Sequence, residues 1–173
     1  MPEVIRLGQV ETDPWHYLGA PPLEDLSQAL PPGALVVPLA AWKERRAELV
    51  ARGEALGVWL KPDDDPGELA LDFAALSLIA VHFPKFTDGR GYSTATLLRG
   101  RHGYRGELRA FGDVGRDQLF YLSRCGFDAF RLADHRDPHQ ALASLRDFRF
   151  RYQGSADDPR PLFRQRAASQ TPT

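Results

Sequence analysis

Reactive side chains are concentrated between residues 84 and 93, where the sequence reads Pro-Lys-Phe-Thr-Asp-Gly-Arg-Gly-Tyr-Ser. Lys85 and Arg90 supply positive charge, and an arginine can bind two oxygens of one anion at once. The residues from Ser93 onward favour a helix, whose first N–H groups would lie beside these cations. The stretch therefore predicts a site for sulfate, sulfite, phosphate or carboxylate, formed by Lys85, Arg90, Gly91 and Ser93.

Three neighbouring side chains are candidates for acid–base chemistry: Asp88, Tyr92 and Asp113. A positioned carboxylate can act as a general base, and a tyrosine can donate a proton. Each side chain also has a purely structural interpretation: Asp88 in an Asp-Gly turn, Tyr92 in packing, and Asp113 as a helix N-cap or as a partner of Arg90. The catalytic residues, if there are any, stay unknown at this point.

Five apolar runs predict the strands that position these residues, at 34–39, 56–60, 78–83, 107–111 and 127–132. Helical spacing of apolar residues between the runs indicates an α/β fold with a mostly parallel sheet of about five strands and flanking helices. A closed (β/α) barrel needs eight strands and roughly 200 to 250 residues. The chain has 173 residues, so we expect an open sheet or an incomplete (β/α) barrel.

Loops that leave the C-terminal ends of parallel strands meet at one edge of the sheet, where such sheets bind ligands. We expect this edge to collect the candidate residues above together with Lys61, Asp134 and His135. His82 lies within an apolar strand and is expected to be a hydrogen-bonded core histidine. Cys125 is expected at the opposite edge, as a buried structural thiol.

The sequence predicts that the chain divides into three parts: an N-terminal arm or lid (1–33), the α/β domain (34–153) and a flexible C-terminal tail (154–173).

The composition limits the possible functions. A net charge of −1 argues against a general nucleic-acid binder, although residues 85–116 carry seven basic and three acidic side chains. The sequence contains no run of about 18 consecutive apolar residues, so no membrane span is predicted. A single cysteine fits a reducing cytoplasm and holds no zinc ion or iron–sulfur cluster by itself, so no metal site is predicted. The common nucleotide and hydrolase motifs are missing, which leaves any cofactor unknown.

Several motifs resemble those of a bacterial family of unknown function. They are the run from Phe83 to Ser93, then Leu97-Leu98-Arg99, Gly103 to Ala110, Gly112-Asp113-Val114, Arg116 to Leu119 and Arg124 to Asp128. The resemblance covers roughly residues 35–145, and Gly115 is less bulky than the family pattern. Members of that family are commonly encoded beside assimilatory sulfite reductase and are described as probable oxidoreductases of sulfite reduction.

The resemblance implies a cytoplasmic role in sulfur assimilation, as an accessory protein or an oxidoreductase component of sulfite reduction. The protein would bind a sulfur oxyanion, or dock on sulfite reductase or its electron donor. Two alternatives stay open: a non-catalytic protein-interaction subunit, and a small-molecule enzyme on a barrel-like scaffold that binds a phosphate or carboxylate. Whether the protein is an enzyme is likewise open.

Overall fold

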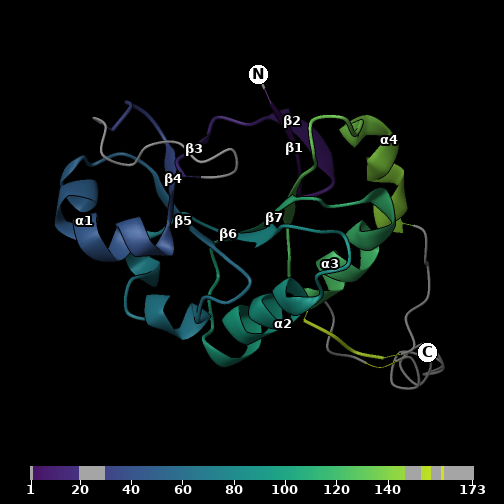
Figure 1. The fold of residues 1–173 in the computed structure, drawn as a ribbon. Coiled ribbons are helices and arrows are strands. Elements are labelled where there is room, and N and C mark those ends of the chain that lie inside the picture. The colour runs from purple at the N-terminus through teal and green to yellow at the C-terminus, as the bar shows by residue number, and fades with distance from the viewer. Residues whose placement is uncertain (1, 20–29, 147–152, 157–160, 162–173) are drawn as a thin grey trace, which may run out of the picture.

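A computed structural model describes residues 2–19, 30–146, 153–156 and 161. One eight-stranded sheet organises the fold, in the order β2-β1-β8-β7-β6-β5-β4-β3 (Figure 1). Neighbours from β3 to β8 are parallel, whereas β1 is antiparallel to both β8 and β2. The strands are β1 (Glu3–Arg6), β2 (Gln9–Thr12), β3 (His16–Tyr17), β4 (Leu35–Pro38), β5 (Leu56–Leu60), β6 (Leu78–Phe83), β7 (Glu107–Gly112) and β8 (Ala129–Arg131).

Helices and helical turns connect the parallel strands. Because β4 to β8 are adjacent in chain order, right-handed crossovers place the connecting helices on one face of the sheet. Figure 1 shows α1, α2 and α3 along one side of the sheet, which curls into an open half-barrel. The helical elements are α1 (Leu39–Ala51), η1 (Pro66–Leu69), η2 (Phe73–Ala75), α2 (Arg90–Thr96), η3 (Leu97–Arg101), η4 (Arg116–Gln118), α3 (Leu119–Cys125), α4 (Pro138–Leu142) and η5 (Ala143–Arg146).

The strand residues alternate between two apolar clusters, one on each face of the sheet. Ile79 and Val81 of β6 belong to the larger cluster, which packs against the helices. Leu78 and Ala80 face the other way and join Trp59 and Phe111 in a smaller cluster on the inner face of the half-barrel. Coverage of both faces explains why the central strands are apolar almost throughout.

The five expected strands are present and parallel, but the prediction of about five strands was too low. β1 and β2 form a hairpin through Leu7 and Gly8, whose positive φ angles of 48° and 79° suit a two-residue turn. β3 is only two residues long, and β2 is mostly exposed, so neither has an apolar run that the sequence could reveal. Most of the expected tail at 154–173 lies outside the described residues.

The link between β2 and β3 requires the sheet to curl. These two strands lie at opposite edges of the sheet, yet only residues 13–15 separate Thr12 from His16. Four residues span at most about 14 Å, whereas seven strand spacings of about 4.8 Å would separate the two edges of a flat sheet by about 34 Å. The link therefore crosses the open side of the half-barrel, and Trp15 and Tyr17 pack on the smaller cluster.

Two helix boundaries follow from the local sequence. Asp137 accepts hydrogen bonds from the backbone N–H groups of His139 (2.8 Å) and Gln140 (3.4 Å), which caps α4 ahead of Pro138. Gly126 ends α3 with a φ of 109°, a left-handed conformation that glycine adopts without strain. Among the described residues, no helix is both long and apolar enough to span a membrane.

Candidate functional site

The loops after β5, β6, β7 and β8 lie along one edge of the sheet, which we name the carboxyl rim. Asp113, after β7, accepts hydrogen bonds from the Phe86 backbone N–H (2.9 Å) and from Arg136 Nη2 (3.1 Å). Asp63, after β5, forms an ion pair with Arg90. These contacts join four loops that are far apart in the sequence, as the parallel sheet predicts.

Arg90 is engaged by carboxylates within the protein. Its Nε and Nη2 donate to the two oxygens of Asp88, at 2.9 and 2.6 Å, and its Nη1 pairs with Asp63. The pairing of Arg90 with Asp113 that was considered from the sequence is replaced by the pairing of Arg136 with Asp113. Two carboxylates thus balance the positive charge that was assigned to the anion site.

Asp88 is held in its charged form by the same contacts. Hydrogen bonds from the Arg90 side chain, opposed by partial burial and helped by the Arg90 backbone N–H, lower the pKa of Asp88 to about 2. A carboxylate with so low a pKa is a weak base at neutral pH. The geometry therefore supports a structural role for Asp88 better than a role as general base.

The ion pair gives a direct prediction for an NMR titration. In the wild type the side-chain carboxyl of Asp88 is expected to titrate at a pKa of about 2, and in Arg90→Gln near the ordinary value of 3.8. A folded-state pKa below the unfolded one means that this pair stabilises the protein above pH 3.8, and the contribution is lost as the pH falls towards 2. Equal titration of Asp88 in both proteins would contradict the pairing.

The helix of the predicted site begins three residues earlier than the sequence indicated. Asp88 Oδ1 accepts from the Arg90 backbone N–H (3.2 Å), so α2 begins at Arg90 and Ser93 lies inside it rather than at its start. A Cβ on Gly91 would lie 2.4 Å from Cζ of Phe83, so this glycine is required by packing. Tyr92 packs its half-buried ring 5.8 Å from that of Phe83, and burial raises its pKa.

The remaining predicted rim residues are on the surface. Lys85 is exposed, and its ammonium group has no ion pair among the described residues. The same holds for three others: Lys61, Asp134 and His135. Lys85 thus keeps its charge available, next to Phe86, which is bound to Asp113. The Asp63–Asp65 loop is used internally, since Asp64 accepts from the Lys61 N–H (2.7 Å) and Asp65 from the Gly67 N–H (2.8 Å).

A cavity of about 230 Å³ opens at the end of β8, and the sequence did not single out its two arginines. It is lined by Pro2, Glu3, Arg131, Leu132, Ala133, Asp134, Arg136 and Pro138. The guanidinium of Arg131 lies 4.6 Å above the Tyr17 ring and has no ion pair among the described residues. The Nε of Arg136 is buried without a hydrogen-bond partner, although its Nη2 reaches Asp113. Arg131 therefore keeps its charge unpaired by the described residues, and Arg136 has one buried donor without an acceptor.

Beside this cavity, aromatic rings cover the inner face of the sheet. The half-buried His82 lies 5.8 Å from Trp59 and 4.9 Å from Phe111, and Tyr17 lies 5.0 Å from Phe111. Among the described residues no hydrogen bond to the His82 side chain is found, so the expected hydrogen-bonded core histidine is a ring in an aromatic cluster. Burial lowers the pKa of His82, and nearby Asp88 opposes that shift. Successive side chains of a strand point to opposite faces of a sheet, and this alternation along β6 and β7 could have placed His82 and Phe111 on the same face.

The described residues include no group of three or more His, Cys, Asp or Glu side chains that could hold a metal ion. Cys125 ends α3 at the edge opposite the carboxyl rim, as expected, but is only half-buried. Three basic side chains of the rim have at least one nitrogen without a partner among the described residues: Lys85, Arg131 and Arg136.

Comparison with known proteins identifies one family. A search of curated proteins finds no match. A family model described as "Bacterial protein of unknown function (DUF934)" matches residues 57–163, which is more than half of the chain and includes β5 to β8 with the whole carboxyl rim. The chain therefore belongs to this family of bacterial proteins, DUF934.

Proposed function

We propose that the protein is a cytoplasmic accessory protein of assimilatory sulfite reduction that binds a small oxyanion at the carboxyl rim. The observation that carries the anion site is the cavity of about 230 Å³ between Arg131 and Arg136. Its size suits a sulfite or sulfate ion with its first waters rather than a large cofactor. The sulfur chemistry comes from the sequence resemblance, and the electrons would come from the reductase.

The two arginines are the groups of this cavity that could bind an anion. Arg136 forms an ion pair with Asp113, in which its Nη2 lies 3.1 Å from Oδ1 of Asp113. The buried Nε of Arg136 has no acceptor among the described residues. Within the described part of the chain, the contact found for the Arg131 guanidinium is with the face of the Tyr17 ring. The lining also holds two carboxylates: Glu3, which lies 3.6 Å from His139, and the exposed Asp134. An oxyanion would supply acceptors for both guanidinium groups, in the two-oxygen geometry that arginine prefers.

Titration calorimetry with sulfite, sulfate and phosphate tests this proposal. Arg131→Ala and Arg136→Gln are each expected to weaken anion binding about tenfold, the effect of one charge-assisted hydrogen bond. Arg136→Gln keeps an amide that can donate to Asp113, so the fold should hold. Arg116→Ala, which removes an exposed arginine of η4, is the control and should bind like the wild type.

Arg90→Ala decides between the two positions of the site on the rim. Because Asp88 and Asp63 already balance Arg90, its loss should change the affinity less than twofold. A large loss of affinity in Arg90→Ala, with none in Arg131→Ala and Arg136→Gln, would move the site to the loop at Lys85 and overturn this cavity. Equal heats for all variants, or no heat at all, would remove the oxyanion proposal.

A second function, as a docking subunit for an acidic redox partner, is favoured by the unpaired basic residues. Of the seven basic side chains between 85 and 116, Arg90, Arg99 and Arg109 are ion-paired internally. The other four are exposed, with no ion pair among the described residues: Lys85, Arg101, Arg105 and Arg116. Association with sulfite reductase that falls steeply between 50 and 300 mM salt, roughly as the Debye length shortens, would support docking.

A further inference from the structure

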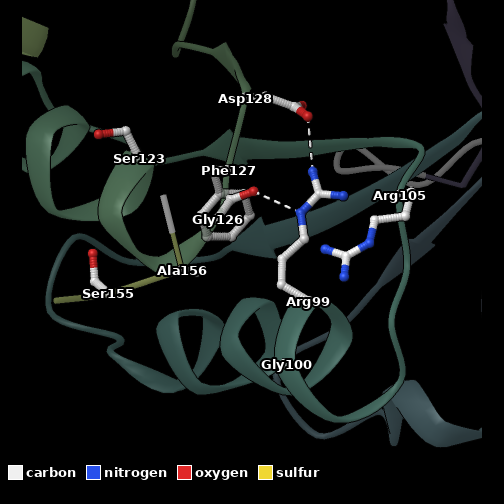
Figure 2. Close-up of a pocket in the computed structure, with 9 residues that line it drawn as sticks. All are labelled: Arg99, Gly100, Arg105, Ser123, Gly126, Phe127, Asp128, Ser155 and Ala156. Carbon is white, nitrogen blue, oxygen red and sulfur yellow. Dashed lines mark hydrogen bonds and ion pairs between the residues drawn. The ribbon is translucent and has the colours of Figure 1, made fainter. Parts of the chain in front are cut away.

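A larger cavity, of about 410 Å³, lies at the opposite edge of the sheet, before β7 and β8 begin (Figure 2). It is bounded by the end of η3, the end of α3 and the segment at 155–156. Its lining consists of Arg99, Gly100, Arg105, Ser123, Gly126, Phe127, Asp128, Ser155 and Ala156. Small and aromatic residues form much of this wall, and the charged groups are confined to two arginines and one aspartate. Such a mixture is typical of sites for small organic ligands.

Arg99 forms the fixed part of this cavity. Its Nε donates to the Gly126 carbonyl (2.9 Å), and its Nη1 to the carbonyls of Tyr104 (2.9 Å) and Gly106 (2.8 Å). Its Nη2 donates to Asp128 (2.8 Å). An arginine has five N–H donors, so four are used and one on Nη2 has no acceptor among the described residues. Arg99 is thus held rigidly and keeps a single donor for a ligand.

Arg105 is the free cation of the cavity. It is exposed, and no ion pair or hydrogen bond of its side chain is found among the described residues. Figure 2 shows its side chain turned towards that of Arg99. Arg124, at the end of α3, adds a third guanidinium beside Ser155. Among the described residues that line the cavity, Asp128 is the only acid, and it is ion-paired with Arg99. Two like charges side by side attract an anion that can bridge them.

The end of α3 does not cancel this attraction. A helix C-terminus carries a partial negative charge that would repel an anion. Here the terminal carbonyls are already bonded: Leu122 by the Phe127 N–H (3.2 Å), Ser123 by the Gly126 N–H (3.0 Å) and Gly126 by Arg99. The arginine charge therefore dominates the field inside the cavity.

The segment at 153–156 closes one side of the cavity. Arg124 Nε donates to the Ser155 hydroxyl (3.2 Å), its Nη2 bonds the Gln153 carbonyl, and the Ala156 N–H donates to the Arg124 carbonyl (3.1 Å). The backbone at Gly126 forms the floor of the cavity and passes close to the Arg99 side chain. A Cβ on Gly126 would lie 2.5 Å from Cγ of Arg99, so a glycine is needed at this position. The wall and the floor are thus built by specific contacts.

We propose that this cavity binds a small phosphorylated organic molecule. The phosphate bridges Arg105 and the remaining N–H of Arg99, and the organic part lies against Gly126, Phe127 and Ala156. A phosphate suits the site because its two negative charges match the excess of arginine, and its tetrahedral oxygens can reach donors on two side chains. This site is separate from the oxyanion site of the carboxyl rim and does not depend on it.

The test uses the full chain, labelled for amide NMR and titrated with phenyl phosphate, inorganic phosphate and benzoate as probes. Phenyl phosphate is expected to shift the amide signals of Gly126, Phe127 and Ala156 and to bind about tenfold more tightly than inorganic phosphate or benzoate. Arg105→Ala should weaken phenyl phosphate about tenfold, and Arg105→Glu should abolish binding. Arg101→Ala is the matched control, because Arg101 is an exposed arginine outside the lining, and should bind as the wild type does.

Gly100 offers a variant that fills part of the cavity. Its added Cβ would meet no atom within 4 Å, so a side chain can start there, and Gly100→Leu is expected to weaken phenyl phosphate binding, with its fold checked by the amide spectrum. The proposal fails if phenyl phosphate shifts no amide at 126–127 or 156, or if Arg101→Ala weakens binding as much as Arg105→Ala. Shifts confined to residues 131–136 would also overturn it while supporting the rim site, so the two proposals fail separately.

Discussion

Replacing Arg109 by alanine is expected to lower the free energy of unfolding by about 3–5 kcal/mol, out of the roughly 5–15 kcal/mol that stabilises a typical domain. The Arg109 side chain is 1% exposed, and Asp13, its partner at 2.8 Å, is fully buried. Removal of the guanidinium leaves the Asp13 carboxylate without a counter-charge inside the protein. A buried charge without a partner costs far more than the pair gives when intact.

Arg109 also joins the segment at residues 13–17 to β7. Besides Asp13 it binds Glu107, through Nε at 2.9 Å and Nη2 at 2.6 Å, and the Tyr17 hydroxyl at 3.2 Å. Burial raises the pKa of Tyr17 to about 12, so that hydroxyl stays protonated. In Arg109→Ala the segment around residues 13–17 should therefore separate from the sheet before global unfolding. Faster amide hydrogen exchange confined to this segment and to β7 would show it.

Arg6→Ala is the matched control for this prediction. Arg6 pairs with the same Glu107 at 2.9 Å, but its side chain is 43% exposed, so its loss should cost no more than about 1 kcal/mol in urea denaturation. The double variant Arg109→Met with Asp13→Asn removes both buried charges and should recover much of the lost stability. Equal costs for Arg109→Ala and Arg6→Ala would contradict the buried network.

The second large effect is expected for Gly112→Ala, which should destabilise the protein by about 3–5 kcal/mol. Gly112 ends β7 with a φ of 104°, where any other residue is strained by about 1–3 kcal/mol. An added Cβ would lie 2.4 Å from the Phe83 carbonyl oxygen, which also accepts the Asp113 N–H at 2.7 Å. That oxygen belongs to the sheet backbone and cannot move aside, so a packing cost of about 1–3 kcal/mol adds to the strain.

Gly103→Ala separates the two terms. Gly103 also has a positive φ, of 70°, but a Cβ there would meet no atom within 4 Å. Its substitution should therefore cost only the backbone strain, about 1–2 kcal/mol. Thermal or urea unfolding of the two variants measures the difference. If Gly103→Ala lowered the free energy of unfolding as much as Gly112→Ala, the contact with the Phe83 carbonyl would not contribute to the effect.

The parallel part of the fold could be predicted because its signals are local. Each of the strands β4 to β8 is an apolar run, and Gly126 and the Asp137-Pro138 pair mark helix ends in the sequence itself. Residues 4–10 suggest a single edge strand, where the structure forms the hairpin of β1 and β2, and β3 is too short to give a signal. The place of β1 in the sheet depends on β8, more than a hundred residues away. No pattern within a short window carries that information.

The candidate site was predictable at the level of loops and less so at the level of side chains. Lys85, Arg90 and Asp113 do lie on one rim, because parallel strands place their loops there. One partner of Arg90, Asp88, is two residues away, but the other was not foreseeable, since Asp63 is distant in the sequence and becomes a neighbour only through the β5–β6 pairing. Arg136 was missed for the same reason, because its value as a ligand group comes from the cavity beside β8.

The edge-to-edge link at residues 13–15 has a consequence for the order in which the protein assembles. β1 pairs with β8, so its place in the sheet is complete only when residues 129–131 are available, whereas β3 needs only β4, at residues 35–38. Contacts between residues as distant as those of β1 and β8 form slowly, because a long loop must close first. The hairpin of β1 and β2 is therefore expected to dock on β8 late in folding.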